Sequence, residues 1–265
     1  MGGQQVAHFL FGGFDTKHTP MSERIRLDKF LLENGFMESR SDAQAAIEAG
    51  KVLVNGAVVQ KASTKVSGED EITAERAHLY VSRAALKLKG ALDTFSLNVA
   101  DAICLDVGCS TGGFTEVLLE AGAEHVFAVD VGRDQFHTRL RDNPRISLFE
   151  QTDARDLTPE QVSRPIDVLV CDASFIGLEK VLQPGLSFVR EGGAAVLLFK
   201  PQFQVGRKAV GKGGIVTDAD AVEAAKISFL AWLGAQGFEL KGWEPSSVTG
   251  SDGNQEYLVY AIKSA

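Results

Sequence analysis

Aspartates and a glycine-rich segment follow successive apolar runs in the C-terminal part of the chain. The run 103–107 continues into Gly108-Cys-Ser-Thr-Gly-Gly-Phe, and glycine lets a backbone turn tightly and approach a ligand closely. Asp130, Asp153 and Asp172 end or follow the next apolar runs. Because parallel strands bring their carboxyl ends to one edge of a sheet, this pattern predicts one crevice for a nucleotide-type cofactor where the strand order reverses.

Within this crevice we expect Asp130 to accept hydrogen bonds from both hydroxyls of a ribose, and Asp153 to lie near an adenine amine. The ordered set resembles the class I methyltransferases, which implies S-adenosyl-L-methionine as cofactor. The predicted cofactor-binding residues are Asp106, Gly108, Ser110, Thr111, Gly112, Gly113, Phe114, Asp130, Asp153 and Asp172. A dinucleotide would favour G-x-G-x-x-G, a spacing that is absent. An NAD-binding oxidoreductase stays open as an alternative, which titration with S-adenosylhomocysteine against NAD would decide.

The elements that must position these residues are strands alternating with helices. Short apolar runs bounded by Gly, Asp or Pro occur at 103–107, 126–131, 166–171 and 194–199, and helical stretches such as 115–121 lie between them. This alternation predicts an α/β fold with a parallel sheet and helices on both faces. The resemblance to the class I methyltransferases implies a Rossmann-like domain whose sheet is seven-stranded and mostly parallel. Two late runs, 238–243 and 257–262, predict an antiparallel edge.

Four further motifs resemble the FtsJ-like ribose methyltransferases, which carry a Lys-Asp-Lys-Glu tetrad. They are Ser82-Arg-Ala-Ala-Leu-Lys-Leu, Cys171-Asp-Ala-Ser-Phe, Phe199-Lys-Pro-Gln-Phe and Asn254-Gln-Glu-Tyr. The resemblance places the tetrad at Lys87, Asp172, Lys200 and Glu256. It implies that Lys200 is the base, Asp172 orients it, Lys87 is a second cation, and Glu256 fixes Lys87.

Such a tetrad suits methyl transfer to a hydroxyl. Displacement at a sulfonium is in-line, so catalysis consists mostly of alignment and charge placement. A lysine can take the hydroxyl proton only when burial or a neighbouring cation makes its own proton easier to lose. The alternative for each residue is an ordinary surface role: Lys87 or its neighbour Lys89 can be a solvated helix lysine, and Glu256 a residue at a strand start.

The N-terminal part of the chain has a different pattern. Leu27, Phe30 and Leu31 form a helical stripe that Gly35 can end, and a second helix is expected to begin at Ser41 as its N-cap and to end near Gly50. The dipeptide Asn55-Gly56 between apolar runs predicts a hairpin with a type I′ turn. A last strand and a linker are expected over 66–80.

The motifs R-L-D-K-F-L and S-R-S-D-A-Q-A-A-I-E-A-G-K-V-L-V-N-G resemble the S4 RNA-binding domain. The resemblance implies a basic face that contacts RNA phosphates, the contacts that give affinity without reading sequence. We also expect Gly206–Gly214 to form a mobile basic loop that closes over RNA, and Phe175 and Phe203 to stack on a base. The predicted RNA-binding residues are Arg24, Arg26, Lys29, Arg40, Lys51, Arg83, Arg207 and Lys212. Solvated surface charge and core packing are the alternatives.

Composition limits these expectations. The net charge is −8, so RNA binding must rest on the local placement of Arg and Lys and not on the total. Three cysteines without C-x-x-C spacing favour neither a disulfide framework nor zinc. Cys171 is expected to be a small buried residue, and His125 and His137 have little support as metal ligands, so no metal is predicted.

An S4 domain joined to an FtsJ-like domain resembles the TlyA family of ribosomal RNA 2′-O-methyltransferases, often labelled haemolysin A. The predicted division is an N-terminal extension at 1–20, the S4-like domain at 21–78 and the methyltransferase domain at 79–265. The resemblance implies ribosomal RNA or ribosomal subunits as partner, a cytoplasmic location and, by default, a monomer. A non-catalytic RNA-binding or ribosome-assembly factor stays open as an alternative. A membrane-active haemolysin is disfavoured, since no basic amphipathic or spanning segment is apparent.

Overall fold

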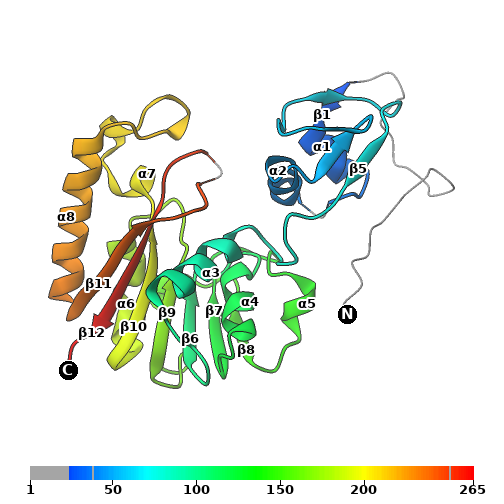
Figure 1. The fold of residues 1–265 in the computed structure, drawn as a ribbon. Coiled ribbons are helices and arrows are strands. Elements are labelled where there is room, and N and C mark those ends of the chain that lie inside the picture. The colour runs from blue at the N-terminus through cyan, green and yellow to red at the C-terminus, as the bar shows by residue number, and fades with distance from the viewer. Residues whose placement is uncertain (1–23, 38, 251) are drawn as a thin grey trace. The chain divides into compact units, whose positions relative to one another are not determined.

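The chain forms two compact units, and each is described here by itself (Figure 1). The computed structural model describes residues 24–37, 39–250 and 252–265. The first unit ends at Arg83 and the second runs from Ala84 to Ala265. The expected N-terminal extension at 1–20 lies outside the described residues.

The N-terminal unit contains two short helices and small antiparallel strand pairs. Its elements are β1 (Ile25–Arg26), α1 (Leu27–Glu33), α2 (Arg40–Glu48), β2 (Val52–Val54), β3 (Ala57–Val58), β4 (Lys65–Val66) and β5 (Ile72–Ala74). The predicted stripe of α1 is buried, with Leu27 and Leu31 at 0 % exposure. Gly35 follows the helix with φ of 72°, the left-handed conformation that a helix-ending glycine adopts.

Two local predictions for this unit have different outcomes. The hairpin at Asn55-Gly56 is confirmed: φ is 52° and 80° at the two residues, and Val54 pairs with Ala57. The N-cap prediction is wrong, because α2 begins at Arg40 and is capped by Ser39, whose side chain accepts a hydrogen bond from the backbone N–H of Asp42. A serine two residues before the expected one already has the extended backbone that a cap needs.

The C-terminal unit is built on a seven-stranded sheet. Its strands are β6 (Ile103–Val107), β7 (His125–Val129), β8 (Ile146–Phe149), β9 (Ile166–Cys171), β10 (Val189–Phe199), β11 (Phe238–Pro245) and β12 (Tyr257–Lys263). The order across the sheet is β11-β12-β10-β9-β6-β7-β8. The strands from β10 to β8 are parallel, and β12 runs antiparallel to both β10 and β11. The predicted parallel sheet with an antiparallel edge is therefore confirmed.

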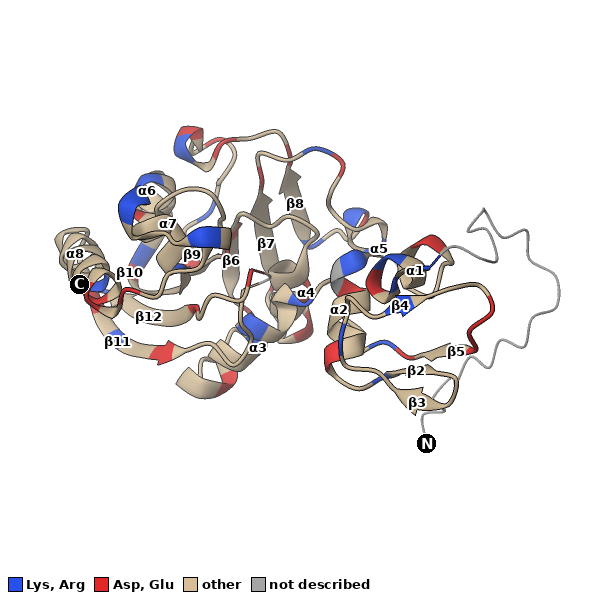
Figure 2. Ribbon diagram, turned by 90° about the horizontal axis from the view of Figure 1, so that it is seen from above, with Lys and Arg blue, Asp and Glu red and all other residues tan. Residues whose placement is uncertain are grey.

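Helices cover both faces of this sheet (Figure 2). The helical elements are α3 (Ala84–Phe95), α4 (Gly113–Glu120), α5 (Thr138–Arg141), η1 (Ala154–Asp156), α6 (Leu178–Phe188), α7 (Pro201–Gln204), η2 (Arg207–Ala209), η3 (Lys212–Gly214) and α8 (Ala219–Ala235). Helix α3 packs on α4 over one face, and α6 packs on α8 over the other. The central strands β6, β7 and β9 are almost wholly apolar and buried, as parallel strands covered on both faces must be.

The strand order reverses between β6 and its two neighbours, β7 and β9. In open parallel sheets a ligand binds outside the carboxyl ends of the strands at such a point. The segments after β6, β7, β8, β9 and β10 therefore supply the candidate site. Among the described helices, none is long and apolar enough to cross a membrane.

Candidate active site

The glycine-rich loop after β6 lies tightly against the neighbouring strand ends. Gly108 has φ of 80°, and a Cβ there would lie 3.1 Å from the Cα of Ala173, the residue after Asp172 at the end of β9. The backbone N–H groups of Gly108 and Cys109 both donate to the carbonyl oxygen of Val129 in β7. Glycine is thus required at 108 both for its conformation and for the close approach of two loops.

Asp130 joins the loops after β6 and β7. Its Oδ2 accepts the backbone N–H of Ser110 at 2.8 Å, and its Oδ1 accepts the backbone N–H of Gly132 at 2.6 Å. A carboxylate has about four lone-pair positions, so a ribose can still be bound. The exposed side chain that follows it is apolar: Val131 is 70 % exposed.

A residue that sequence reasoning missed fixes the loop after β7. Glu150, directly after β8, accepts the backbone N–H groups of Gln135 and Phe136 and pairs with Arg141 at 2.7 Å. The Arg141 hydrogen bond, helped by the two N–H groups, lowers the pKa of Glu150 to about 2. Nothing in the local sequence around Glu150 signals these contacts, because its partners come from a separate loop.

Asp106 is wholly buried in β6 and accepts the Thr115 hydroxyl at 2.6 Å. Burial, assisted by the charges of Asp172 and Asp130, raises the pKa of Asp106 to about 7. Its carboxyl therefore lies beneath the loop and does not face solvent. Asp130 and Asp172 are both close enough to Asp106 to act on it, so three carboxyl groups gather at this end of the sheet.

Asp153 has a partner of its own. It caps η1 through the backbone N–H of Arg155 and holds the Arg155 guanidinium, with the Nε at 2.9 Å from Oδ1. The side-chain hydrogen bond from Arg155 lowers the pKa of Asp153. An adenine amine that binds Asp153 must share this carboxylate with Arg155.

The other predicted cofactor residues lie in or beside the same loop. Gly112, with φ of 92°, is the N-cap of α4, and Gly113 is its first residue. Phe114 and Gly113 are buried, whereas Thr111 is half-buried and Ser110 is exposed.

Lys87 and Glu256, 169 residues apart in the chain, form a buried ion pair. Lys87 lies in α3, Glu256 directly precedes β12, and Lys87 Nζ is 2.6 Å from Glu256 Oε2. Their side chains are 9 % and 3 % exposed, while Lys89 is exposed. Gly250 permits the arrangement, since a Cβ there would lie 2.8 Å from Glu256 Oε1. A surface role for Lys87 and Glu256 is therefore ruled out.

Lys200 and Asp172 form a second pair at the ends of β10 and β9. Lys200 Nζ lies 2.7 Å from Asp172 Oδ1 and donates to the Asp172 carbonyl at 3.2 Å and the Ser174 hydroxyl at 2.8 Å. The lysine is 6 % exposed. Ser174, which sequence reasoning missed, is thus a direct partner of the proposed base.

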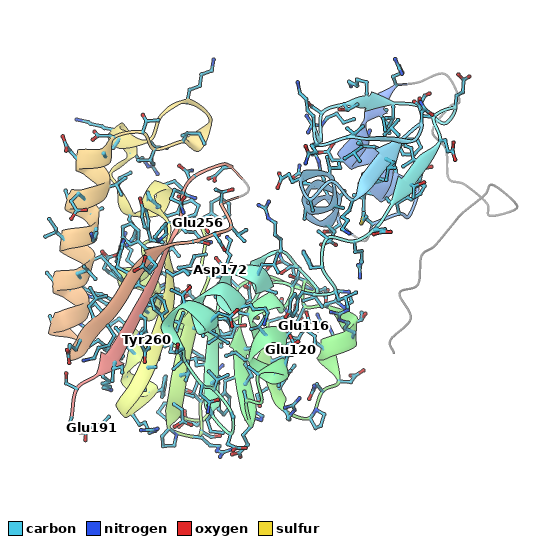
Figure 3. All side chains as sticks on the ribbon, viewed as in Figure 1. Glu116, Glu120, Asp172, Glu191, Glu256 and Tyr260 are labelled. Atoms are coloured by element: carbon cyan, nitrogen blue, oxygen red, sulfur yellow. The ribbon has the colours of Figure 1, made fainter. Side chains whose placement is uncertain are left out.

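The two pairs belong to one cluster. Burial raises the pKa of Glu256, Lys87 and Lys200 oppose that rise, and Asp172 adds to it. The other three tetrad residues therefore all lie close enough to Glu256 to act on it electrostatically. Figure 3 shows Asp172 and Glu256 at one end of the sheet, with Glu191 and Tyr260 toward the other.

Aromatic and basic residues flank the cluster. Phe175 is 90 % exposed in a left-handed conformation with φ of 66°, and its ring centroid lies 5.2 Å from that of Phe203. Arg207 and Lys212 are exposed in η2 and η3. The expected basic loop is therefore partly helical.

Asn254, which sequence reasoning did not single out for a role of its own, ties this basic segment to the residues before β12, which include Glu256. The Asn254 side chain is buried and bonds the carbonyl oxygen of Gly214 and the backbone N–H of Val216, each at 2.9 Å.

The predicted RNA-binding residues of the N-terminal unit all have carboxylate partners. Arg24 lies near Asp70, Arg26 and Arg40 bind Asp28, Lys29 pairs with Glu33, Lys51 with Glu75, and Arg83 with Glu48. Pairs whose two side chains are both exposed, such as Lys29–Glu33 and Lys51–Glu75, contribute little to stability, whereas Asp28 is buried.

The remaining residues weighed from the sequence have structural roles. Cys171 is buried in β9, as expected. His125 lies 3.0 Å from the Ser147 hydroxyl, and His137 caps α5.

The chemistry of the crevice suits a cation and not a pyrophosphate. Asp130 and Asp172 follow the strands on either side of the loop 108–113, Asp106 lies buried beneath it, and the loop itself contains no lysine or arginine. A sulfonium is complementary to this acidic end, whereas a pyrophosphate is repelled by it. The residues present therefore fit S-adenosylmethionine.

Comparison with known proteins agrees with this chemistry. Residues 80–263 match the model of the FtsJ-like methyltransferase family, and residues 25–72 match the S4 domain. The chain belongs to the FtsJ-like methyltransferase family. It is accordingly a methyltransferase with S-adenosylmethionine as its methyl donor, and the predicted family is confirmed.

Relatives match over nearly the whole chain. The 16S/23S rRNA (cytidine-2′-O)-methyltransferase TlyA of Mycobacterium tuberculosis is 41 % identical over 91 % of this chain and 90 % of its own. Hemolysin A of Brachyspira hyodysenteriae is 38 % identical over 90 % of this chain and 100 % of its own. A solved structure described as a hemolysin from Streptococcus thermophilus is 36 % identical, with a TM-score of 0.72, over 91 % of this chain and 89 % of that one.

Proposed function

We propose that this methyltransferase transfers a methyl group from S-adenosylmethionine to a ribose 2′-hydroxyl of ribosomal RNA. The observation that carries the proposal is the presence of two buried ion pairs, Lys87–Glu256 and Lys200–Asp172. Both lie beside the predicted cofactor site at the carboxyl ends of the parallel strands. Base methylation does not require a buried lysine cluster, whereas a hydroxyl acceptor must lose a proton.

In this proposal Lys200 takes that proton. The bound cofactor supplies an activated methyl group on a sulfonium. Asp172 and Ser174 hold Lys200 Nζ in one position, and a neutral Lys200 amine accepts the 2′-hydroxyl proton. Lys87, fixed by Glu256, places a second cation in the cluster, which stabilises the oxyanion that develops on the acceptor.

Phe175 is proposed to position the acceptor nucleotide. It is exposed, strained at φ of 66°, and one residue from Ser174. An exposed aromatic ring beside the catalytic lysine can stack on a nucleobase that has been taken out of the RNA. Phe203 supports it from α7, and the basic residues Arg207 and Lys212 contact neighbouring phosphates.

Ribosomal RNA or a ribosomal subunit is the proposed substrate, because the TlyA relatives act on 16S and 23S rRNA and the chain carries an S4 domain. The reaction then takes place in the cytoplasm, where ribosomes assemble, and a monomer suffices for it. A tethered S4 unit raises the local RNA concentration at the catalytic unit.

Measuring methyl transfer by the Lys200→Met variant tests the assignment of Lys200 as the base. We expect this variant to lose transfer by at least about a thousandfold, in the range typical of a lost general base and its alignment, while S-adenosylhomocysteine affinity stays within about twofold of wild type. The matched control Lys89→Met removes an exposed lysine and should keep wild-type transfer. Wild-type turnover by Lys200→Met would refute the role of Lys200. Absence of transfer by the wild type would instead favour the alternative of a non-catalytic RNA-binding factor.

A further inference from the structure

Glu150, directly after β8, holds a separate stretch of chain at two points. Its Oε1 accepts the backbone N–H groups of Gln135 at 2.9 Å and Phe136 at 3.2 Å. Its Oε2 lies 2.7 Å from Nη2 of Arg141, the last residue of α5. A single carboxylate thus binds both ends of residues 135–141, which we call the α5 segment. The Glu150 side chain is 12 % exposed, so these contacts are largely shielded from water.

Two buried side chains of the α5 segment lie against the glycine-rich loop. A Cβ added at Gly112 would lie 2.8 Å from the ring of Phe136 and 2.8 Å from a methyl group of Leu140. Both side chains are buried. Gly112 has φ of 92° and is the N-cap of α4, so the turn that ends the glycine-rich loop is packed directly against the segment that Glu150 holds.

Hydrogen bonds join the α5 segment to the predicted cofactor residues as well. The backbone N–H of His137 donates to the Thr111 carbonyl at 3.1 Å, and the Ser110 hydroxyl lies 3.4 Å from Oε1 of Gln135. The backbone N–H of Ser110 in turn donates to Asp130, the predicted ribose-binding carboxylate, at 2.8 Å. A displacement of the α5 segment would therefore be transmitted to Ser110, Thr111 and Asp130.

Glu150 is ionised in this arrangement. The hydrogen bond from Arg141 and the two backbone N–H groups lower the pKa of Glu150 to about 2, and hydrogen bonds to a charged acceptor are stronger than neutral ones. All three donors come from the α5 segment and none from the glycine-rich loop. Any influence of Glu150 on the loop must therefore pass through the segment.

We propose that Glu150 is a positioning residue for S-adenosylmethionine: by fixing the α5 segment, it holds the glycine-rich loop and Asp130 in the conformation that binds the cofactor. Glu150 acts through Phe136, Leu140 and the backbone of the segment, without touching the cofactor itself. The inference concerns cofactor binding alone, so it does not depend on which atom of the RNA accepts the methyl group.

The test is calorimetric binding of S-adenosylhomocysteine to Glu150→Ala and to a matched control, Asp167→Ala. Asp167 is also a carboxylate with a backbone and an arginine partner: it accepts the backbone N–H of Ile103 at 2.8 Å and pairs with Arg190 at 2.6 Å. It lies near the start of β9, whereas Asp172 follows the end of that strand. We expect Glu150→Ala to weaken binding by about tenfold or more, the effect of losing one hydrogen bond to a charged group, and Asp167→Ala to stay within about twofold of wild type.

Two milder variants keep part of the arrangement. Glu150→Gln retains an oxygen for the two N–H groups, and Arg141→Met removes the ion pair alone, so both should bind with affinities between those of the wild type and Glu150→Ala. In methyl transfer the KM for S-adenosylmethionine should rise in the same order, while kcat at saturating cofactor stays within about threefold of wild type, because the tetrad lies on other elements.

Circular dichroism verifies that each variant is folded. Wild-type affinity in Glu150→Ala, an equal loss in Asp167→Ala, or a loss confined to kcat would overturn the positioning role. If Glu150→Ala does not fold, the milder variants decide: wild-type affinity in both Glu150→Gln and Arg141→Met would overturn the role, and weakened binding in both would support it.

Discussion

Replacing Glu256 by glutamine should destabilise the catalytic unit and nearly abolish transfer, because it leaves the Lys87 ammonium buried without a counter-charge. The two side chains are 9 % and 3 % exposed and 2.6 Å apart. Removing one partner of such a pair costs about 3–5 kcal/mol. The amide oxygen of the introduced glutamine can still accept a hydrogen bond from Lys87, which recovers about 1 kcal/mol. We therefore expect a loss of about 2–4 kcal/mol in the free energy of unfolding.

Tryptophan fluorescence during urea unfolding measures this loss for the catalytic unit. The chain has two tryptophans, Trp232 in α8 and Trp243 in β11. Both belong to the catalytic unit, so their signal reports its unfolding and not that of the S4 unit. Lys89→Met is the control, since it changes an exposed lysine of the same helix and should leave the transition within about 0.5 kcal/mol of wild type.

A double-mutant cycle then isolates the pair itself. In Lys87→Met/Glu256→Gln neither charge remains, so the combined loss should fall short of the sum of the two single losses by about 2 kcal/mol or more. Single-turnover transfer, measured where every variant is folded, should fall by at least about a hundredfold in each. Additive stability losses, or wild-type transfer by Glu256→Gln, would refute the reasoning that the pair acts as one unit.

Three further changes have defined outcomes. Asp106→Asn should stabilise the catalytic unit at pH 8 but not near pH 4. The pKa of Asp106 is about 7 in the folded state and lower in the unfolded state, so the wild type loses stability as the pH rises from about 4 to 7. Urea unfolding at several pH values checks this. Gly108→Ala should cost about 1–3 kcal/mol because φ is 80° and Ala173 is in the way, and should weaken S-adenosylhomocysteine binding in calorimetry. Ser174→Ala should slow transfer about tenfold by removing a hydrogen bond to Lys200, with unchanged cofactor affinity; equal rates would count against that contact.

Local sequence patterns were enough to predict the alternation of strands and helices, whereas the seven-stranded sheet was expected from the family resemblance. The strand at Ile103–Val107, the glycine turn after it and the hairpin at Asn55-Gly56 each depend on neighbouring residues, and the structure has all three. The two late apolar runs predicted the antiparallel edge for the same reason. The wrong N-cap at the start of α2 shows the limit, because two serines two residues apart satisfy the same rule.

The site was less accessible to sequence reasoning, because its contacts join distant segments. The tetrad residues were predicted only through resemblance, and the structure brings them into two ion pairs; their roles stay predictions. The contacts of Glu150 and Ser174 could not be predicted, since each depends on how separate loops meet. The burial of Asp28 has the same origin: its partners Arg40 and Gln44 come from another helix.

The most direct test of the central claim is methyl transfer from labelled S-adenosylmethionine to bacterial rRNA and ribosomal subunits, followed by alkaline hydrolysis. A 2′-O-methyl group blocks cleavage of the next phosphodiester, so the account predicts label in alkali-resistant dinucleotides, and its loss in Lys200→Met. Label in ordinary mononucleotides would move the acceptor to a base and contradict the role of the lysine cluster.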